Sequence, residues 1–205
     1  MTSIKKLKQM TALLASLIAM LLVYFIFSDF IKQPEKPLTG TFLTPSKPLA
    51  TFNLLSTQGR PLNTEVLRGQ WTLLFFGYSR CGSVCPATLK IVSNALMRMD
   101  EKKHLKPNFI MITLDAKHDT PSTLKTYLQT FNRDFIGAIG AQQEVKSFAN
   151  SLGIVFDENS NRASSEAFTH SGTLVLVNPH AEVSAYFSPP FNAEQLAHDL
   201  LISVS

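Results

Sequence analysis

The stretch FFGYSRCGSVCPATLK, from Phe75 to Lys90, holds the only two cysteines of this 205-residue chain. Cys81 and Cys85 lie four positions apart, after a strongly apolar run and directly before Pro86. A continuous apolar run is typical of a strand buried on both faces of a sheet. Proline favours the first positions of a helix. The stretch therefore predicts a strand, a loop that carries both cysteines, and a helix.

Two cysteines in such a loop could form a disulfide staple, act as a redox couple or hold a metal ion. A domain of about 150 residues buries enough apolar surface to fold without a staple, so the purely structural alternative is disfavoured. We expect Cys85 to lie at the start of the helix, where the helix dipole and free amides stabilise a thiolate, and Arg80 to add to this effect. The redox and metal alternatives both remain open on this pattern.

The rest of the chain alternates between strand-like and helix-like segments. The apolar patterns predict strands at 52–55, 71–77, 109–114, 154–156, 173–177 and 182–187, and helices at 86–99, from Pro121 onward, at 142–152 and at 192–204. The order is βαβ, a further helix, and then ββα. This order predicts an α/β fold with a mixed central sheet and flanking helices, in the thioredoxin-like layout.

The N-terminal part carries a different signal. From Thr11 to Phe27 the chain has 17 residues without a charge, glycine or proline. A helix over residues 10–30 would cover a hydrocarbon core of about 30 Å. No small-residue cleavage site follows, so we expect an uncleaved transmembrane anchor rather than a signal peptide. The Pro-rich residues 31–47 then predict a linker, and residues 48–205 the folded domain.

The charge distribution sets the expected orientation. Lys5, Lys6 and Lys8 precede the apolar run, which places residues 1–9 in the cytoplasm by the positive-inside rule. We therefore expect a single-pass protein of the bacterial inner membrane, with its C-terminal domain in the periplasm. The remaining chain has 16 basic and 15 acidic side chains and no basic stripe, so nothing in it indicates a nucleic-acid partner.

A metal site built on two thiolates needs a third ligand, and five histidines are available. We expect His104, His180 and His198 to lie at the surface. His118 follows a predicted strand, and His170 directly precedes the strand at 173–177. A set of Cys81, Cys85 and His170 would be three-coordinate and soft, which suits Cu(I) better than a structural zinc ion. On the residues alone, a single histidine at the start of a strand is more often structural than a ligand.

Four separate motifs in order, FFGYSRCGSVCPATL, MITLDAKHDTPSTLKTYL, FIGAIG and FTHSGTLVLVNP, resemble the Sco/SenC family of membrane-anchored copper proteins. The resemblance covers roughly residues 46–200. It implies a thioredoxin-like fold and a copper site formed by Cys81, Cys85 and His170. It also implies a metallochaperone that delivers copper to the dinuclear copper centre of cytochrome c oxidase, with the oxidase subunit that carries this centre as partner. The second motif of the family is matched by Asp115, Asp119, Thr120 and Pro121.

Three positions depart from the family pattern. Gly82 stands where proline is common, His118 where arginine is usual, and Thr169 where an acidic residue commonly precedes the ligand histidine. The alternative function is a thiol–disulfide reductase, which would need Cys81 and Cys85 but not His170, and could require a thiol reductase partner. A peroxide-reducing or redox-sensing relative is a third alternative. Of these we favour the metallochaperone over an enzyme.

Overall fold

The computed structural model describes residues 2–31, 36–101, 106–158, 168–169 and 172–204. Residues 1–36 and residues 37–205 form two separate units. The first unit contains one helix, α1, from Thr2 to Ile31. Among the residues that the structure describes, no helix is long and apolar enough to cross a membrane. The predicted anchor over residues 10–30 therefore stays a prediction.

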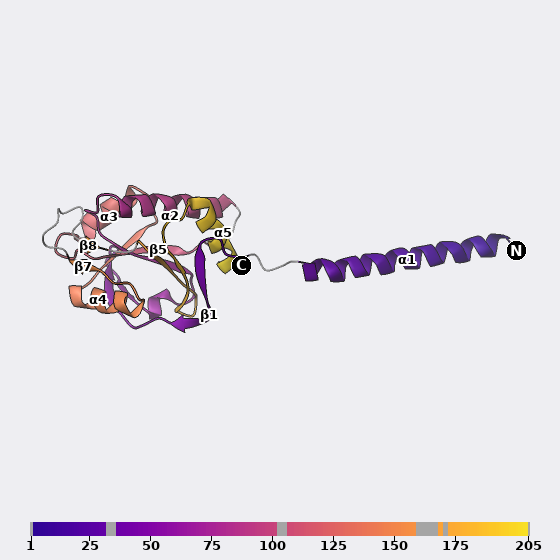
Figure 1. Ribbon diagram of the computed structural model, residues 1–205, viewed down its shortest axis with the longest axis horizontal. Helices are drawn as coiled ribbons and strands as arrows, with labels where there is room; N and C mark the ends of the chain where they lie inside the picture. Colours follow the sequence, from indigo (N-terminus) through magenta and orange to yellow (C-terminus); the bar gives the residue numbers. More distant parts are fainter. Residues whose placement is uncertain (1, 32–35, 102–105, 159–167, 170–171, 205) are drawn as a thin grey trace. The chain divides into compact units, whose positions relative to one another are not determined.

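The second unit is a mixed sheet with helices on both faces (Figure 1). Its helices are α2 (Val84–Glu101), α3 (Pro121–Gln129), α4 (Gln142–Ser151) and α5 (Ala193–Val204), with a short 3-10 turn, η1, at Glu65–Leu67. Its strands are β1 (Gly40–Pro48), β2 (Asn53–Ser56), β3 (Pro61–Asn63), β4 (Thr72–Gly77), β5 (Asn108–Thr113), β6 (Ile136–Ile139), β9 (Leu174–Val177) and β10 (Glu182–Phe187). A separate two-stranded ladder pairs β7 (Asp157–Glu158) with β8 (Phe168–Thr169).

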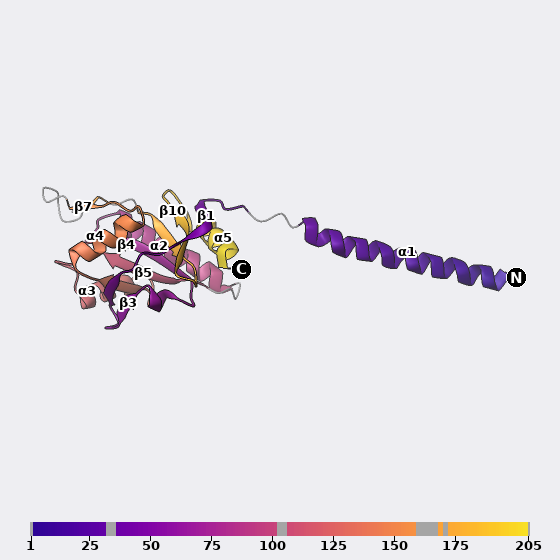
Figure 2. The ribbon, with the colours of Figure 1, turned by 90° about the horizontal axis from the view of Figure 1, so that it is seen from below.

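The strand order in the large sheet is β1-β10-β9-β4-β5-β6-β2-β3. Strands β4, β5 and β6 run parallel, and the remaining pairs are antiparallel. Figure 2 shows β4 and β5 in the middle of the sheet, with β1 and β3 at opposite sides. This placement agrees with the sequence, because every residue of β4 is buried. The predicted mixed sheet with flanking helices is confirmed.

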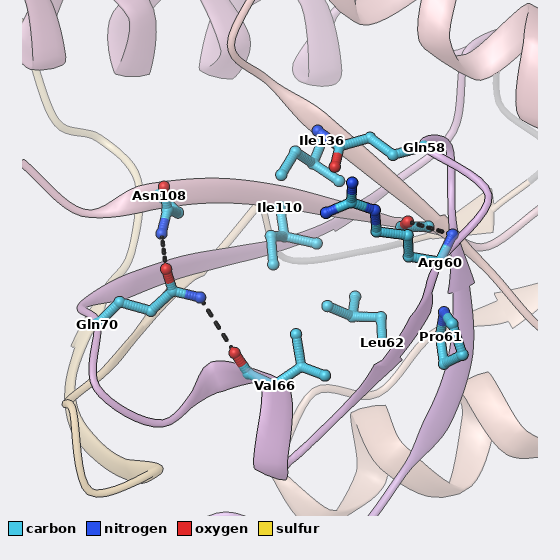
Figure 3. Close-up of a pocket in the computed structure, with 10 residues that line it drawn as sticks. Gln58, Arg60, Pro61, Leu62, Val66, Gln70, Asn108, Ile110 and Ile136 are labelled. Carbon is cyan, nitrogen blue, oxygen red and sulfur yellow. Dashed lines mark hydrogen bonds between the residues drawn. The ribbon is translucent and has the colours of Figure 1, made fainter.

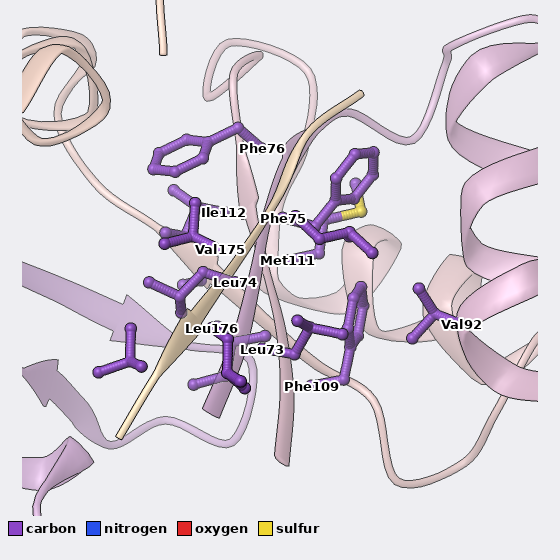
Figure 4. Close-up of a cluster of buried hydrophobic side chains, with 14 of the residues drawn as sticks. Leu73, Leu74, Phe75, Phe76, Val92, Phe109, Met111, Ile112, Val175 and Leu176 are labelled. Carbon is purple, nitrogen blue, oxygen red and sulfur yellow. The ribbon is translucent and has the colours of Figure 1, made fainter. Parts of the chain in front are cut away.

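Alternate residues of the central strands face two different helical layers. Figure 4 shows Phe75, Phe109 and Met111 on the side of Val92 from α2, and Phe76 on the other side of the sheet. The ring of Phe76 lies 5.8 Å from that of Phe148, which belongs to α4. Both faces of β4 are therefore covered, which explains its uninterrupted apolar sequence.

Helix boundaries follow local signals that the sequence carries. Thr120 caps α3 by accepting a hydrogen bond from the amide of Thr123, and Pro121 is its first residue, as predicted. Asn192 caps α5 in the same way, through a 2.9 Å bond from the amide of Gln195. Gly153, which follows the C-cap residue Leu152 of α4, has a positive φ of 70°, as expected for a residue that ends a helix.

Four expectations were wrong or incomplete. Residues 40–47 of the predicted linker belong to the edge strand β1, which tolerates prolines because one side makes no ladder bonds. The expected strand at 154–156 does not form. Strand β6 was missed because Gly137 and Gly140 interrupt a short apolar pattern. Helix α2 begins at Val84, two residues earlier than predicted.

Candidate metal centre

Both cysteines lie at the junction of β4 and α2, as the sequence predicted. Strand β4 ends at Gly77, and Cys85 is the second residue of α2. Both cysteine side chains are buried, with Cys81 8 % and Cys85 0 % exposed. The backbone amide of Cys85 donates to the sulfur of Cys81 over 3.3 Å. The first turn of α2 therefore draws one sulfur toward the helix that carries the other.

The thiol of Cys85 behaves differently from the sequence prediction. Its pKa is strongly raised, first by its hydrogen bond with Cys81, then by burial and by the charge of Cys81. A hydrogen bond from the backbone of Tyr78 lowers this pKa, but the nearby charge of Asp119 raises it further. The expectation that the helix terminus stabilises a thiolate at Cys85 is wrong for the metal-free protein. Burial and the second sulfur outweigh the helix amides, and a bound metal cation would favour the thiolate.

The loop before Cys81 is hydrogen-bonded to a buried carboxylate, that of Asp119. Asp119, which is 2 % exposed, accepts a 3.1 Å bond from the amide of Ser79 and a second bond from its hydroxyl. The hydroxyl of Thr113, at the end of β5, donates to the same carboxylate over 2.5 Å. Asp119 therefore fixes the backbone two residues ahead of Cys81. Asp119, which matches the second motif of the family, therefore has a structural role in the cysteine loop. The spacing of the motif did not predict this role.

Asp115 pairs with Arg80, the basic residue directly before Cys81. Arg80 donates to its Oδ2 from Nη2 over 2.5 Å and from Nε over 3.2 Å, while Nδ1 of His118 lies 2.7 Å from its Oδ1. Burial raises the pKa of Asp115, but the bonds and charges of Arg80 and His118 outweigh it and lower the pKa overall. Arg80 is thus paired with a carboxylate, and the predicted support of a cysteine thiolate by Arg80 is not seen.

His118 lies in the same cluster as Arg80 and Asp115. Its Nδ1 also lies 2.6 Å from Nη2 of Arg80, so this nitrogen faces Arg80 and Asp115. A ring nitrogen either donates or accepts, so it bonds one of these two groups at a time. His118 takes the place of the arginine that the family pattern favours, and it extends the charged cluster around Asp115.

Cys81 and Cys85 are brought together, but their predicted third partner, His170, lies outside the described residues. Within the described ranges, no three His, Cys, Asp or Glu side chains gather to hold a metal ion. The backbone two residues after His170 is described, however. A Cβ built on Gly172 would lie 3.3 Å from Cγ1 of Val84 and 3.1 Å from Cγ of Pro189. Gly172 therefore packs against the residue directly before Cys85.

A pocket of about 280 Å³ lies away from the cysteines, between the β2–β3 hairpin, η1 and the first residues of β5 and β6. Figure 3 shows the side chains of Gln58 and Arg60 beside apolar residues that include Leu62, Ile110 and Ile136. The cysteine loop follows the carboxyl end of β4, whereas this pocket involves the amino end of the parallel strand β5. No predicted site residue lines it.

One residue of the cysteine neighbourhood escaped the sequence analysis. Tyr127 lies on α3, and its pKa is raised first by burial and then by the charges that Cys85, Cys81 and Asp119 carry when they are ionised. Its spacing from Leu124 and Leu128 is that of an ordinary core position, so no sequence signal distinguishes it from a packing residue.

A buried dithiol at the strand-to-helix junction of a mixed, helix-covered sheet defines a thioredoxin-like dithiol protein. Comparison with known proteins makes the class more specific. A family model described as SCO1/SenC matches residues 43–204. The chain therefore belongs to the SCO1/SenC family.

Individual relatives agree with this assignment. A "Putative copper-binding protein" of Stutzerimonas stutzeri is 30 % identical over 145 residues, which are 71 % of either chain. The mitochondrial "Protein SCO1 homolog 2" of Arabidopsis thaliana is 30 % identical over 154 residues, 75 % of this chain but only 56 % of that longer protein. The copper-bound structure of Bradyrhizobium japonicum ScoI is 28 % identical with a TM-score of 0.66, over 75 % of this chain and 97 % of that one. The thioredoxin-like Sco fold is confirmed.

Proposed function

We propose that this protein is a metallochaperone that binds one copper ion through Cys81, Cys85 and His170 and passes it to an acceptor. The observation that carries the proposal is the pair of buried cysteines that lie together at the start of α2. Thiolates are soft ligands, and two of them with one imidazole suit Cu(I) at low coordination number. The position of Gly172 favours His170 as the third ligand. Gly172 lies two residues after His170 in the sequence, and it packs against Val84, the residue directly before Cys85.

The raised pKa of Cys85 bears on how copper would be captured. Because this thiol keeps its proton in the metal-free protein, copper binding displaces the proton to solvent, and affinity rises with pH. Copper would leave by exchange of ligands with soft groups of the acceptor. Both steps require reduced cysteines, so an oxidised pair carries no copper.

The acceptor that we propose is the dinuclear copper centre of cytochrome c oxidase. The structure of BsSco, which has a similar fold, is described as that of a member of the Sco family of cytochrome c oxidase assembly proteins. The chain's family membership supports the same partner here.

Copper titration of the reduced full-length protein, solubilised in mild detergent, tests the proposal. We expect one Cu(I) per chain for the wild type and sharply weakened binding for His170→Ala, because two thiolates alone leave the ion under-coordinated. Failure of the reduced wild type to retain copper would contradict the proposal. Cys81→Ser/Cys85→Ser serves as the control that lacks both sulfurs.

The second candidate function is thiol–disulfide reduction, which the contact between the amide of Cys85 and the sulfur of Cys81 favours. One thiolate would attack a disulfide of the acceptor, and the other would resolve the mixed disulfide, leaving this pair oxidised. A separate thiol reductase would then restore it. His170→Ala discriminates between the two functions, because oxidase assembly that is unchanged in this variant would support the reductase.

We also propose that residues 10–30 anchor the protein in the bacterial inner membrane, with residues 1–9 in the cytoplasm and the folded unit in the periplasm. The support is the charge-free run from Thr11 to Phe27, with three lysines ahead of it, in a segment that forms one 30-residue helix. After alkaline carbonate extraction of bacterial membranes, we expect the full chain in the pellet and a variant that lacks residues 1–36 in the supernatant. Full extraction of the intact chain would contradict the anchor.

A further inference from the structure

The pocket of about 280 Å³ at the β2–β3 hairpin contains one charged group. Arg60 is the only charged residue among the ten described residues that line it, and the others are apolar or carry neutral amide or hydroxyl groups. In the part of the chain that the structure describes, the guanidinium of Arg60 has no hydrogen-bond or ion-pair partner. The pocket therefore presents an uncompensated cation.

A tight turn holds the backbone of Arg60 at the edge of the pocket. The amide of Ser56 donates to the carbonyl of Arg60 over 2.9 Å, and the amide of Arg60 donates to the hydroxyl of Ser56 over 3.2 Å. Gly59, within this turn, has a positive φ of 76°, which glycine adopts without strain. Figure 3 shows the side chain of Arg60 extending from the turn across the pocket, with its guanidinium beside Ile110 and Ile136. The cation is thus positioned before a ligand binds.

The surface beneath the guanidinium is apolar. Ile110 and Ile136 are direct neighbours in the parallel pair of β5 and β6, and Leu62 of β3 lines the pocket beside them. Val66 of η1 also lines the pocket and is 47 % exposed. An apolar group that enters the pocket removes part of this surface from water, which is favourable by the hydrophobic effect.

The wall that faces away from Arg60 is tied together by its own hydrogen bonds. The side-chain amide of Asn108 donates to Oε1 of Gln70 over 2.6 Å, and Nε2 of Gln70 donates to the carbonyl of Val66 over 3.1 Å (Figure 3). At the other end of the pocket, Figure 3 shows the side chain of Gln58 beside the guanidinium of Arg60. A polar ligand group therefore finds its donors at the Arg60 end.

This arrangement fits an anion that carries an apolar chain. A guanidinium binds a carboxylate through two parallel, charge-assisted hydrogen bonds. Phosphate sites usually combine several cations or the free amides of a helix N-terminus, and one arginine supplies less than that. A volume of about 280 Å³ holds roughly nine groups of the size of a water molecule or a methylene, at about 30 Å³ each. A carboxylate with a short aliphatic chain has this size.

We propose that this pocket binds a small aliphatic carboxylate, with the carboxylate paired to Arg60 and the chain packed against Ile110 and Ile136. The pocket involves the amino end of β5, whereas the cysteines follow the carboxyl end of β4. Binding there requires no copper, so it is independent of the proposed function of the cysteine pair.

Sodium hexanoate is the probe, and the methyl NMR signals of Ile110 and Ile136 report its binding to the full-length protein in mild detergent. We expect saturable shifts of both signals in the wild type. Arg60→Gln should weaken binding about fivefold, because solvent screens the exposed guanidinium and limits its contribution. Butanoate should bind about 4- to 16-fold more weakly than hexanoate, because two methylene groups fewer cover the apolar surface. Hexylammonium, with the same chain and the opposite charge, should cause no saturable shift.

Arg68→Gln is the matched control. Arg68 is also exposed, but it pairs with Glu65 and with the carbonyl of His180, and it does not line the pocket. This variant should bind hexanoate as the wild type does. Detergent takes up the same share of the probe in each titration, so differences between variants report on the pocket.

The proposal is overturned if hexanoate causes no saturable shift in the wild type, or if Arg60→Gln binds it as tightly as the wild type. It is also overturned if Arg68→Gln loses as much affinity as Arg60→Gln, or if hexylammonium binds as well as hexanoate. None of these results bears on copper binding by the cysteines.

Discussion

Asp199→Ala is expected to lower the free energy of unfolding by about 3 kcal/mol or more, because several donors lose their shared acceptor. The Asp199 carboxylate on α5 is fully buried. It accepts bonds from the amides of Leu38, Thr39 and Gly40 over 2.7 to 2.8 Å, and from the hydroxyl of Thr39 over 3.0 Å. These residues lead into the edge strand β1. Alanine would leave the donors unpaired and release the start of the strand.

The same contacts predict that the stability of the folded protein decreases in acid. Burial raises the pKa of Asp199, but the amides of Leu38 and Thr39, with His198 and Gly40, outweigh it and lower the pKa overall. A carboxyl whose pKa is lower in the folded protein contributes stability that is complete above its unfolded value, about 3.9. This contribution is lost as the pH falls through the folded value. Wild-type stability should therefore drop below about pH 4, and the drop should be smaller in Asp199→Ala.

Urea unfolding followed by fluorescence of the single tryptophan measures both effects. A loss of this size corresponds to a melting temperature roughly 10 °C lower for a chain of this length. Glu194→Ala is the matched control, since it removes an exposed carboxylate from the same helix. The role of Asp199 would be contradicted if both variants lost the same free energy of unfolding. It would also be contradicted if the stability of Asp199→Ala fell in acid as much as that of the wild type.

The predictable parts of this molecule are those whose cause lies within one segment. The fully apolar stretch 72–77 predicted β4 because a central strand buries both faces. Thr120 and Asn192 predicted helix starts because a cap bonds an amide three residues ahead. The two cysteines of the candidate metal centre were identified for the same reason, since a single loop carries both.

The parts that could not be predicted depend on partners far along the chain. Strand β1 exists because it pairs with β10, about 140 residues later, and its own sequence resembles a linker. The raised pKa of Cys85 depends on burial and on Asp119, 34 positions away, whereas its place at a helix start indicated the opposite shift. Tyr127 has the spacing of a core residue, and only the packed structure reveals its unpaired hydroxyl. In each case a long-range contact overrides or adds to the local signal.

Gly77→Ala is expected to weaken Cu(I) binding about tenfold or more, because the added methyl group would displace a proposed ligand. Gly77 ends β4, and a Cβ there would lie 2.9 Å from the sulfur of Cys85 and 2.8 Å from Cε1 of Phe75. Both neighbours are fully buried, so neither can move aside without disturbing the core. The sulfur must shift away from the strand, which changes the geometry of the proposed metal centre.

Gly137→Ala separates this effect from general overpacking. Gly137 lies in β6, where a Cβ would meet Leu124 at 2.5 Å and Thr57 at 2.6 Å, without contact to a cysteine. Each substitution should lower the free energy of unfolding by about 1–3 kcal/mol, because each crowds a packed interior. Under the proposed function, only Gly77→Ala should weaken copper binding when both folded variants are titrated with Cu(I) against a competing chelator. If Gly77→Ala bound Cu(I) as tightly as the wild type, the sulfur of Cys85 would tolerate the shift. If both variants lost the same Cu(I) affinity, copper affinity would follow stability rather than the position of this sulfur.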